Sequence, residues 1–209
     1  MTNSKSLLVI MGAGGHGRVV AEIAELGSFS RIVFVDTQAS QIRQNLHWPV
    51  VGKSFDDVSG KFSAFVAIGD NALRLTKIAE LTACGIEPVT LVHPSASVSR
   101  YAILGSGTVI MPQVVVNAGA HIGRGVIANS GCTIDHDCII GDGVHISPGV
   151  NLAGGVNVGD CSWIGIGSCV REGLSIGRNV VVAAGSVVVS SIADGQRVFG
   201  APARPKAKP

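Results

Sequence analysis

The segment Asp135-His136-Asp137 contains the side chains whose types and spacing best suit chemistry. A histidine flanked by carboxylates can act as a general base, because a nearby negative charge raises the proton affinity of the imidazole. Gly154 lies one coil after His136 in the repeat described below, and a backbone N–H there could stabilise a developing oxyanion. The pattern predicts a proton-transfer site, and the alternative is a histidine solvated at the surface.

Three histidines within one stretch also raise the possibility of a zinc site. They are His121, His136 and His145. A zinc ion needs three protein ligands that converge at about 2 Å. The spacings between these histidines are not whole coils of the repeat, so the three side chains are expected on different corners or coils. We therefore predict no metal.

A second candidate site lies near the N-terminus, where Gly12-x-Gly14-x-x-Gly17 follows an apolar run. Asp36 ends the next apolar run, about 20 residues after Gly17. This arrangement matches the dinucleotide-binding fingerprint. The glycines could equally hold one phosphate pair at a helix N-terminus, or form a tight turn with no ligand.

A six-residue repeat predicts the elements that hold His136. An aliphatic residue occupies every sixth position from Val98 to Val188. Helices have a period of 3.6 residues and alternating strands a period of 2, so neither explains the pattern. Such a repeat is typical of a parallel β-helix, in which three short strands close one coil. The series is Val98, Leu104, Ile110, Val116, Ile122, Ala128, Ile134, Ile140, Ile146, Leu152, Val158, Ile164, Val170, Ile176, Val182 and Val188.

Glycine recurs at three times this spacing, which is one coil. Gly105, Gly123, Gly141, Gly159 and Gly177 each follow a member of the series. We expect them to stack in one column, at a corner that needs a positive φ. The series covers about five coils without a slip in register, which excludes a long loop inserted between coils.

The register also places the candidate residues relative to one another. Gly154 shares a corner with His136 one coil away, whereas His145 lies half a coil round the prism. His136 and His145 therefore meet only across a subunit interface. We predict a homotrimer with active sites between subunits, covered by the N-terminal domain.

The residues before the repeat predict an α/β domain with a small parallel sheet covered on both faces. His93-Pro94 marks the junction, so we divide the chain into residues 1–92, residues 93–197 and a C-terminal tail, 198–209. The expected strands are Leu7–Met11, Ile32–Val35, Ala64–Ile68 and Val89–Val92, and the expected helices are Arg18–Leu26 and Ala72–Cys84.

Composition excludes several classes of protein. The net charge of +2 comes from scattered basic residues, which argues against nucleic-acid binding. Residues 101–123 carry no Asp, Glu, Lys or Arg, but they keep the six-residue repeat and contain polar residues, so we predict no membrane span. With no signal peptide at the N-terminus, we expect a cytoplasmic protein. The five cysteines include no CxxC pair, and Cys132 and Cys138 are expected to be buried structural thiols.

Five motifs together resemble one family over essentially the whole chain. They are GAGGHG at 12–17, AIGDN at 67–71, HPSA at 93–96, DHD at 135–137 and GAPAR at 200–204. The chain resembles the sialic acid O-acetyltransferase-like (NeuD/PglD-type) left-handed β-helix acetyltransferases. The members it resembles most acetylate the amine of nucleotide-activated 4-amino sugars.

The resemblance implies roles for individual residues. His136 matches the general base and Asp137 its acidic partner, although Asp135 remains a rival for that role. Thr37 departs from relatives that have a second acid there, which leaves the nucleotide open. The implied acetyl-CoA-binding residues are Asn129, His145, Gly154, Ile166, Ala184, Gly185 and Arg204. The implied nucleotide-sugar-binding residues are Gly12, Gly14, Gly15, His16, Asp36, Thr37 and Gly69.

The resulting hypothesis is a trimeric N-acetyltransferase that moves acetyl from acetyl-CoA to the 4-amino group of a UDP- or GDP-linked 4-amino-4,6-dideoxy sugar. Residues 1–92 would be a Rossmann-like nucleotide-sugar-binding domain and residues 198–209 a tail over the CoA site. The product would enter a bacterial surface glycan or a glycoprotein glycan. One alternative is O-acetylation of sialic acid or a related sugar, and another is a nucleotide-binding scaffold without catalysis.

Overall fold

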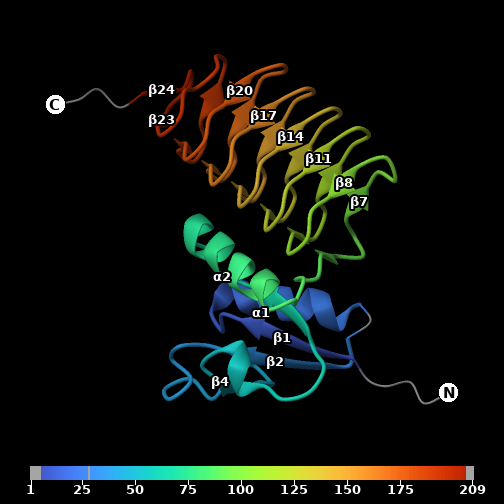
Figure 1. The fold of residues 1–209 in the computed structure, drawn as a ribbon. Coiled ribbons are helices and arrows are strands. Elements are labelled where there is room, and N and C mark those ends of the chain that lie inside the picture. Colours follow the sequence, from blue (N-terminus) through green and yellow to red (C-terminus); the bar gives the residue numbers. More distant parts are fainter. Residues whose placement is uncertain (1–5, 28, 206–209) are drawn as a thin grey trace. The chain divides into compact units, whose positions relative to one another are not determined.

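The computed structural model describes residues 6–27 and 29–205. These residues form two compact units, and the boundary between them in the sequence lies between Pro94 and Ser95 (Figure 1). The sequence predicts an α/β domain followed by a β-helix, and this fold class is confirmed. No helix among the described residues is long and apolar enough to cross a membrane.

The first unit is built on a five-stranded sheet in the order β3-β4-β2-β1-β5. All its pairings are parallel except the one between β3 and β4, which form an antiparallel pair. Its elements are β1 (Leu7–Met11), α1 (Gly15–Glu25), β2 (Arg31–Val35), β3 (Gln44–Asn45), β4 (Trp48–Gly52), the 3-10 helix η1 (Phe55–Asp57), β5 (Ser63–Val66), α2 (Asn71–Ala83) and β6 (Leu91–Val92).

Side chains alternate between the two faces of this sheet, and each face is covered, as the sequence predicts. On one face, Val9 and Val33 are buried in a cluster with Ile78 of α2 and Phe55 of η1. On the other face, α1 packs closely, because a Cβ added at its Gly17 would lie 3.1 Å from the ring of Phe34. The sheet therefore holds the N-terminus of α1 at the carboxyl end of β1.

Both helices begin earlier than the sequence pattern indicates. α1 begins at Gly15 instead of Arg18, so the last glycines of the motif form its first turn. Periodicity misses this start because glycine carries no side chain that could mark a helix face. α2 begins at Asn71 and ends at Ala83, where Ala72 and Cys84 were expected. The carboxylate of Asp70 caps it by accepting a hydrogen bond from the N–H of Leu73, at 2.8 Å.

The sheet has two unexpected strands, β3 and β4, and lacks one that was expected. β4 was not predicted, because it contains Pro49, which has no N–H to donate. It nevertheless pairs with β2 through residues that follow the proline, Phe34 with Val50 and Val35 with Gly52. The predicted fourth strand shortens to Leu91–Val92 and does not belong to this sheet.

The second unit is a parallel β-helix of sixteen two-residue strands and a short C-terminal hairpin. Each strand pairs with the strand three places along the chain, so that Val115 lies beside Thr133 and His121 beside Ile139. The strands are β7 (Ser97–Val98), β8 (Ile103–Leu104), β9 (Val109–Ile110), β10 (Val115–Val116), β11 (His121–Ile122), β12 (Ile127–Ala128), β13 (Thr133–Ile134), β14 (Ile139–Ile140), β15 (His145–Ile146), β16 (Asn151–Leu152), β17 (Asn157–Val158), β18 (Trp163–Ile164), β19 (Cys169–Val170), β20 (Ser175–Ile176), β21 (Val181–Val182), β22 (Val187–Val188), β23 (Arg197–Phe199) and β24 (Arg204–Pro205).

The members of the six-residue series form the core of the β-helix. Residues such as Ile134 and Ile146 are fully buried, as are the small side chains two positions before them. Cys132 and Cys138 occupy two of these positions and are also fully buried, as predicted. Burial raises the pKa of the Cys132 thiol to about 12, so this thiol stays protonated at neutral pH.

The glycine column exists, but the predicted reason for it was wrong. A Cβ added at Gly105 would lie 2.5 Å from the backbone of Gly123, so the coils stack too closely for a side chain there. None of the five glycines has a positive φ. The left-handed conformation occurs two residues later in each coil, at Gly107, for example, and at Cys161 and Asn179.

Candidate functional site

The imidazole of His136 lies at a corner of the β-helix, between β13 and β14. Asp137 follows it in the left-handed conformation, with φ of 59°. The chain reverses so sharply there that two consecutive side chains meet. The carboxylate of Asp137 lies 2.9 Å from Nδ1 of His136. Both side chains are exposed, which leaves the imidazole open to a second reactant.

Asp135 holds the same corner in a different way. Its carboxylate accepts hydrogen bonds from the backbone N–H of His136 and from Nδ2 of Asn117, both at 2.7 Å. Of the two carboxylates, Asp137 contacts the ring and Asp135 contacts the backbone and the previous coil. Asn117 was not predicted, although it lies one coil before Asp135 and the repeat therefore places the two residues side by side.

The coils on either side of His136 leave space for its side chain and that of Asp137. Gly154 lies against the imidazole, and a Cβ added there would lie 2.5 Å from both Cε1 and Nε2. Gly119, one coil before Asp137, gives similar room, because its Cβ would collide with Oδ1 of Asp137. The register prediction that Gly154 lies beside His136 agrees with this geometry.

The hydrogen bond that the imidazole of His136 donates to the carboxylate of Asp137 raises the pKa of His136 above its ordinary value, and the charge of Asp135 raises it further. We expect Asp137→Asn to move the acid limb of the pH–rate profile to lower pH, because His136 then loses the larger of these two effects. Asparagine tolerates a positive φ, so the corner is retained. The measurement is kcat/KM against pH. The matched variant Asp135→Asn should shift the limb less, and the reverse order would assign the supporting role to Asp135.

A groove of about 370 Å³ lies on the sheet that contains β12, β15, β18 and β21. Four residues expected to bind acetyl-CoA line it, namely Asn129, His145, Ile166 and Ala184. The full lining is Asn129, His145, Ser147, Pro148, Trp163, Gly165, Ile166, Val181, Val182, Ala183 and Ala184. This wall is largely apolar, which suits the pantetheine arm of coenzyme A.

Three residues expected with this set do not line the groove. Gly154 lies at the His136 corner instead, and Gly185 follows Ala184 at a corner, with its N–H bonded to the carbonyl of Ile166. Arg204 lies in β24, and its guanidinium donates to the carbonyl of Ala203. His136 does not line the groove either. Within one chain His136 and the groove are therefore at separate places on the β-helix.

Two of the groove residues that were not predicted, Trp163 and Ser147, contact each other. Trp163 is half-exposed, and its ring stacks on that of His145 with 5.4 Å between centroids. Its Nε1–H donates to Oγ of Ser147 at 2.8 Å. Trp163 lies one coil after His145, so the repeat was again a usable signal.

The glycine motif of the first unit forms the turn between β1 and α1. Gly12 has φ of +106°, and a Cβ on Gly17 would collide with the carbonyl of Gly12, so both positions need glycine for the turn itself. Gly14 and Gly15 are different: both are exposed, and an added Cβ would meet nothing within 4 Å. Packing does not require glycine at these two positions, so their bare backbone is available to a ligand.

Polar residues hold this loop in place. The carboxylate of Asp36 accepts hydrogen bonds from the N–H of Ala13 at 2.8 Å and of Gln38 at 2.9 Å. Asn45 is buried and donates to the carbonyls of Ala13 and Gly14. Asn45 was missed, because it lies in β3, which the sequence did not predict. Gly14 is the N-cap of α1 and offers no side-chain cap, so the first amides of the helix face the loop.

A buried arginine holds the segment that contains Gly69. The guanidinium of Arg74 is 1% exposed and donates to the carbonyls of Ile68 and Gly69 and to the side chain of Asn71. Its charge also acts on His16, whose Nε2 is buried without a hydrogen-bond partner. Thr37, the last residue expected here, is exposed just after Asp36.

Burial, assisted by the charge of Arg74, lowers the pKa of His16 from 6.5 to about 4. We expect NMR titration to show that His16 stays neutral down to about pH 4, whereas the pKa of His136 lies above the ordinary value for histidine. Because the folded-state pKa of His16 lies below the unfolded value, its contribution to stability is complete above pH 6.5 and falls as the pH drops towards 4. A His16→Gln spectrum assigns the resonance, and titration of His16 near pH 6.5 would contradict its burial.

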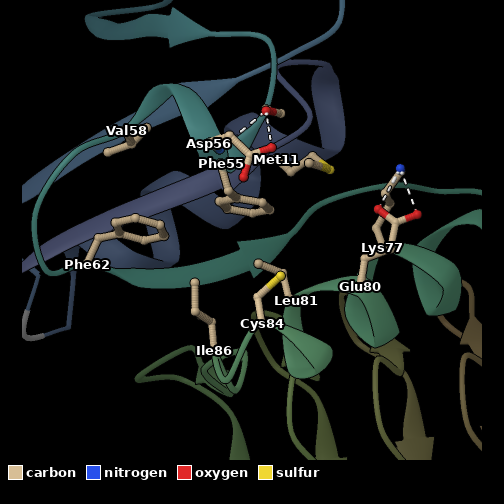
Figure 2. Close-up of a pocket in the computed structure, with 11 residues that line it drawn as sticks. Met11, Phe55, Asp56, Val58, Phe62, Lys77, Glu80, Leu81, Cys84 and Ile86 are labelled. Atoms are coloured by element: carbon tan, nitrogen blue, oxygen red, sulfur yellow. Dashed lines mark hydrogen bonds and ion pairs between the residues drawn. The ribbon is translucent and has the colours of Figure 1, made fainter.

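The first unit also contains a cavity of about 490 Å³ between η1 and α2 (Figure 2). Phe55 and Phe62 stack in its wall with 6.1 Å between centroids, and Lys77 and Glu80 form an ion pair at 2.8 Å. None of the residues expected to bind the nucleotide sugar lines this cavity. Among residues 6–27 and 29–205, no group of three or more His, Cys, Asp or Glu side chains is placed to hold a metal ion.

Comparison with known proteins places the chain in a class. Residues 7–81 match the family model of the PglD N-terminal domain, and residues 119–154 match the bacterial transferase hexapeptide repeat. The class is therefore that of bacterial hexapeptide-repeat transferases with a PglD-type N-terminal domain.

Two similar solved structures identify the family within this class. The acetyltransferase domain of PglB from Neisseria gonorrhoeae FA1090, in complex with acetyl coenzyme A, is 40% identical, with a TM-score of 0.92, covering 97% of this chain and 100% of that one. PerB from Caulobacter crescentus, in complex with CoA and GDP-perosamine, is 38% identical, with a TM-score of 0.86, covering 96% and 97%. The chain belongs to the PglD-type family of left-handed β-helix acetyltransferases, which confirms the resemblance read from the sequence.

A curated relative agrees with this assignment. The UDP-N-acetylbacillosamine N-acetyltransferase of Bacillus subtilis (strain 168) is 36% identical over 110 residues, which is 50% of each protein. The chain matches about half the length of the curated relatives.

Proposed function

We propose that this protein is an acetyl-CoA-dependent N-acetyltransferase that acts on the 4-amino group of a nucleotide-linked 4-amino-4,6-dideoxy sugar. The observation that carries the proposal is the imidazole of His136, held by Asp137 at 2.9 Å and left exposed beside a glycine. The relatives named above are an acetyltransferase domain solved with acetyl coenzyme A and a protein solved with CoA and GDP-perosamine.

In this proposal the sugar amine attacks the thioester carbonyl directly. His136 takes a proton from the amine as the C–N bond forms, and the amide of Gly154 holds the oxyanion of the tetrahedral intermediate. The C–S bond of the intermediate then breaks, and the departing thiolate takes the proton from His136, so that CoA leaves as the thiol and the imidazole is neutral again. No covalent acyl-enzyme forms in this proposal. Cys138, the nearest thiol in the sequence, is a poor nucleophile because it is buried and this burial raises its pKa.

The nucleotide sugar would bind at the loop between β1 and α1. Gly14 and Gly15 would bring backbone N–H groups close to the phosphates, and the uncapped N-terminus of α1 favours negative charge there. Asp36 and Thr37 would lie near the ribose and base. The groove lined by His145 and Trp163 would hold acetyl-CoA.

We further propose that the working form is a cytoplasmic homotrimer. His136 and the groove belong to different parts of one prism, so a base from one subunit would serve a groove on its neighbour. Mixing two inactive variants, one at His136 and one in the groove, should then restore part of the activity after subunit exchange. A failure to recover activity, with exchange verified, would place the whole site in one subunit.

The deciding experiment follows CoA release by thiol titration with a panel of UDP- and GDP-linked 4-amino-4,6-dideoxy sugars, with free sialic acid as the control acceptor. We expect turnover with one or more of the nucleotide amino sugars. Turnover only with sialic acid would support O-acetylation instead, and no thiol release with any acceptor would support a scaffold.

A further inference from the structure

The side chains of His145 and Trp163 are register partners on β15 and β18. Neighbouring strands of a sheet lie about 4.8 Å apart, so outward side chains at matched positions lie directly beside each other. Here the two rings are nearly parallel, with an interplanar angle of 3° and 5.4 Å between centroids. Stacking of this kind restricts rotation of the imidazole about its side-chain torsions.

The indole is itself held in place. Its Nε1–H donates to Oγ of Ser147 at 2.8 Å, and Ser147 is only 5% exposed. Trp163 is 47% exposed, so one face of the indole covers His145 while part of the ring remains open to the groove. A half-exposed aromatic ring would otherwise sample several rotamers, and the hydrogen bond selects one of them.

The imidazole is also restrained from the previous coil. Nδ2 of Asn129 lies 3.3 Å from Nε2 of His145. His145 is therefore held between Asn129 on one side and Trp163 on the other, and all three line the same groove. Placing a binding group in advance lowers the entropy lost when the ligand binds.

We propose that Trp163 is a positioning residue for the acyl donor, which fixes the imidazole of His145 by stacking and is itself fixed by Ser147. This inference rests on the proposed function only in that the groove holds CoA. It adds a residue pair, Trp163 and Ser147, that the resemblance did not assign.

The test compares Trp163→Leu, Trp163→Phe and Ser147→Ala with the wild-type protein, using free CoA as the probe. Leucine removes both stacking and the hydrogen bond, phenylalanine keeps a ring over His145, and Ser147→Ala releases the indole. Titration calorimetry gives the Kd for CoA. NMR follows the ring protons of His145, which the indole shifts upfield. Steady-state kinetics separate the KM for acetyl-CoA from the KM for the sugar.

We expect Trp163→Leu to raise the Kd for CoA about two- to tenfold, in line with the strength of an aromatic pair, and to abolish the upfield shift. The KM for the nucleotide sugar should not change. Trp163→Phe should keep the shift and bind CoA within about twofold of wild type. Ser147→Ala should weaken both the shift and CoA binding. We expect all three variants to fold, because Trp163 is half-exposed and Ser147→Ala removes a single hydroxyl.

Unchanged CoA binding in Trp163→Leu would overturn the proposal, as would a loss of binding in Trp163→Phe equal to that in Trp163→Leu. If Trp163→Leu does not fold, Ser147→Ala is the deciding variant. A wild-type Kd for CoA in Ser147→Ala, together with a wild-type shift of the His145 ring protons, would then overturn the proposal. The proposed function fails separately, when wild-type protein binds CoA but releases no thiol with any amino sugar.

Discussion

Replacing His136 with alanine is expected to lower kcat for acetyl transfer by about 10²–10⁴-fold, the usual contribution of a positioned general base. The imidazole is exposed and outside the hydrophobic core, so the variant should unfold at the wild-type temperature. The KM for acetyl-CoA should change little, because His136 does not line the groove. Thiol release from acetyl-CoA under saturating substrates is the measurement.

His121→Ala is the matched control for this substitution. His121 is a second exposed histidine of the β-helix, on β11, and it has no part in the proposed site. We expect wild-type turnover from it. If His136→Ala keeps nearly full activity, His136 is not the base, and an equal loss in both variants would reopen the question of a shared metal ion.

Gly154→Ala should lower activity by about 10²-fold, the loss that a small misplacement of a catalytic group produces. The added Cβ would lie 2.5 Å from Cε1 and Nε2 of His136, so the imidazole must swing away. The backbone is not the obstacle, since Gly154 does not have a positive φ. The same corner position in the neighbouring coils is occupied by Ala118, His136 and Glu172.

Glu172→Ala, one coil further along the same corner, is the control and should retain wild-type turnover. Circular dichroism should show that Gly154→Ala folds as stably as the wild type. Chemical shifts of the His136 ring that match those of the wild type, together with wild-type activity, would show that the imidazole does not depend on Gly154 for its position.

The β-helix was predictable because its rule is local and repeated. Each series member must fill the same interior, so residues as far apart as Val116 and Val182 obey one pattern. Outward positions have no such rule. Nothing in the local sequence distinguishes Trp163 from a solvated side chain, and its importance is visible only beside His145, one coil away.

In the first unit, the pattern of apolar residues did not predict the elements that contain glycine or proline, namely the start of α1 and the strand β4. Gly15 and Gly17 belong to the first turn of α1, although neither has a side chain to mark a helix face. β4 was not predicted because it contains Pro49. Asn45 lies in β3, which pairs with β4, so its position beside the glycine loop could not be inferred either. The carboxylate that contacts the ring of His136 was likewise undecided, because the corner conformation of Asp137 settles it.

In the second unit, each residue pairs with the residue one coil further along the chain, so the spacing in the sequence fixes its partner. The contacts at the His136 corner follow this register: Asn117 with Asp135, Gly119 with Asp137, and His136 with Gly154. An insertion shorter than one coil between two partners would shift every later residue out of this register. A whole coil added after Val188 would leave all of these contacts intact. Length in such a protein can therefore evolve in steps of one coil, with the chemistry of the earlier coils unchanged.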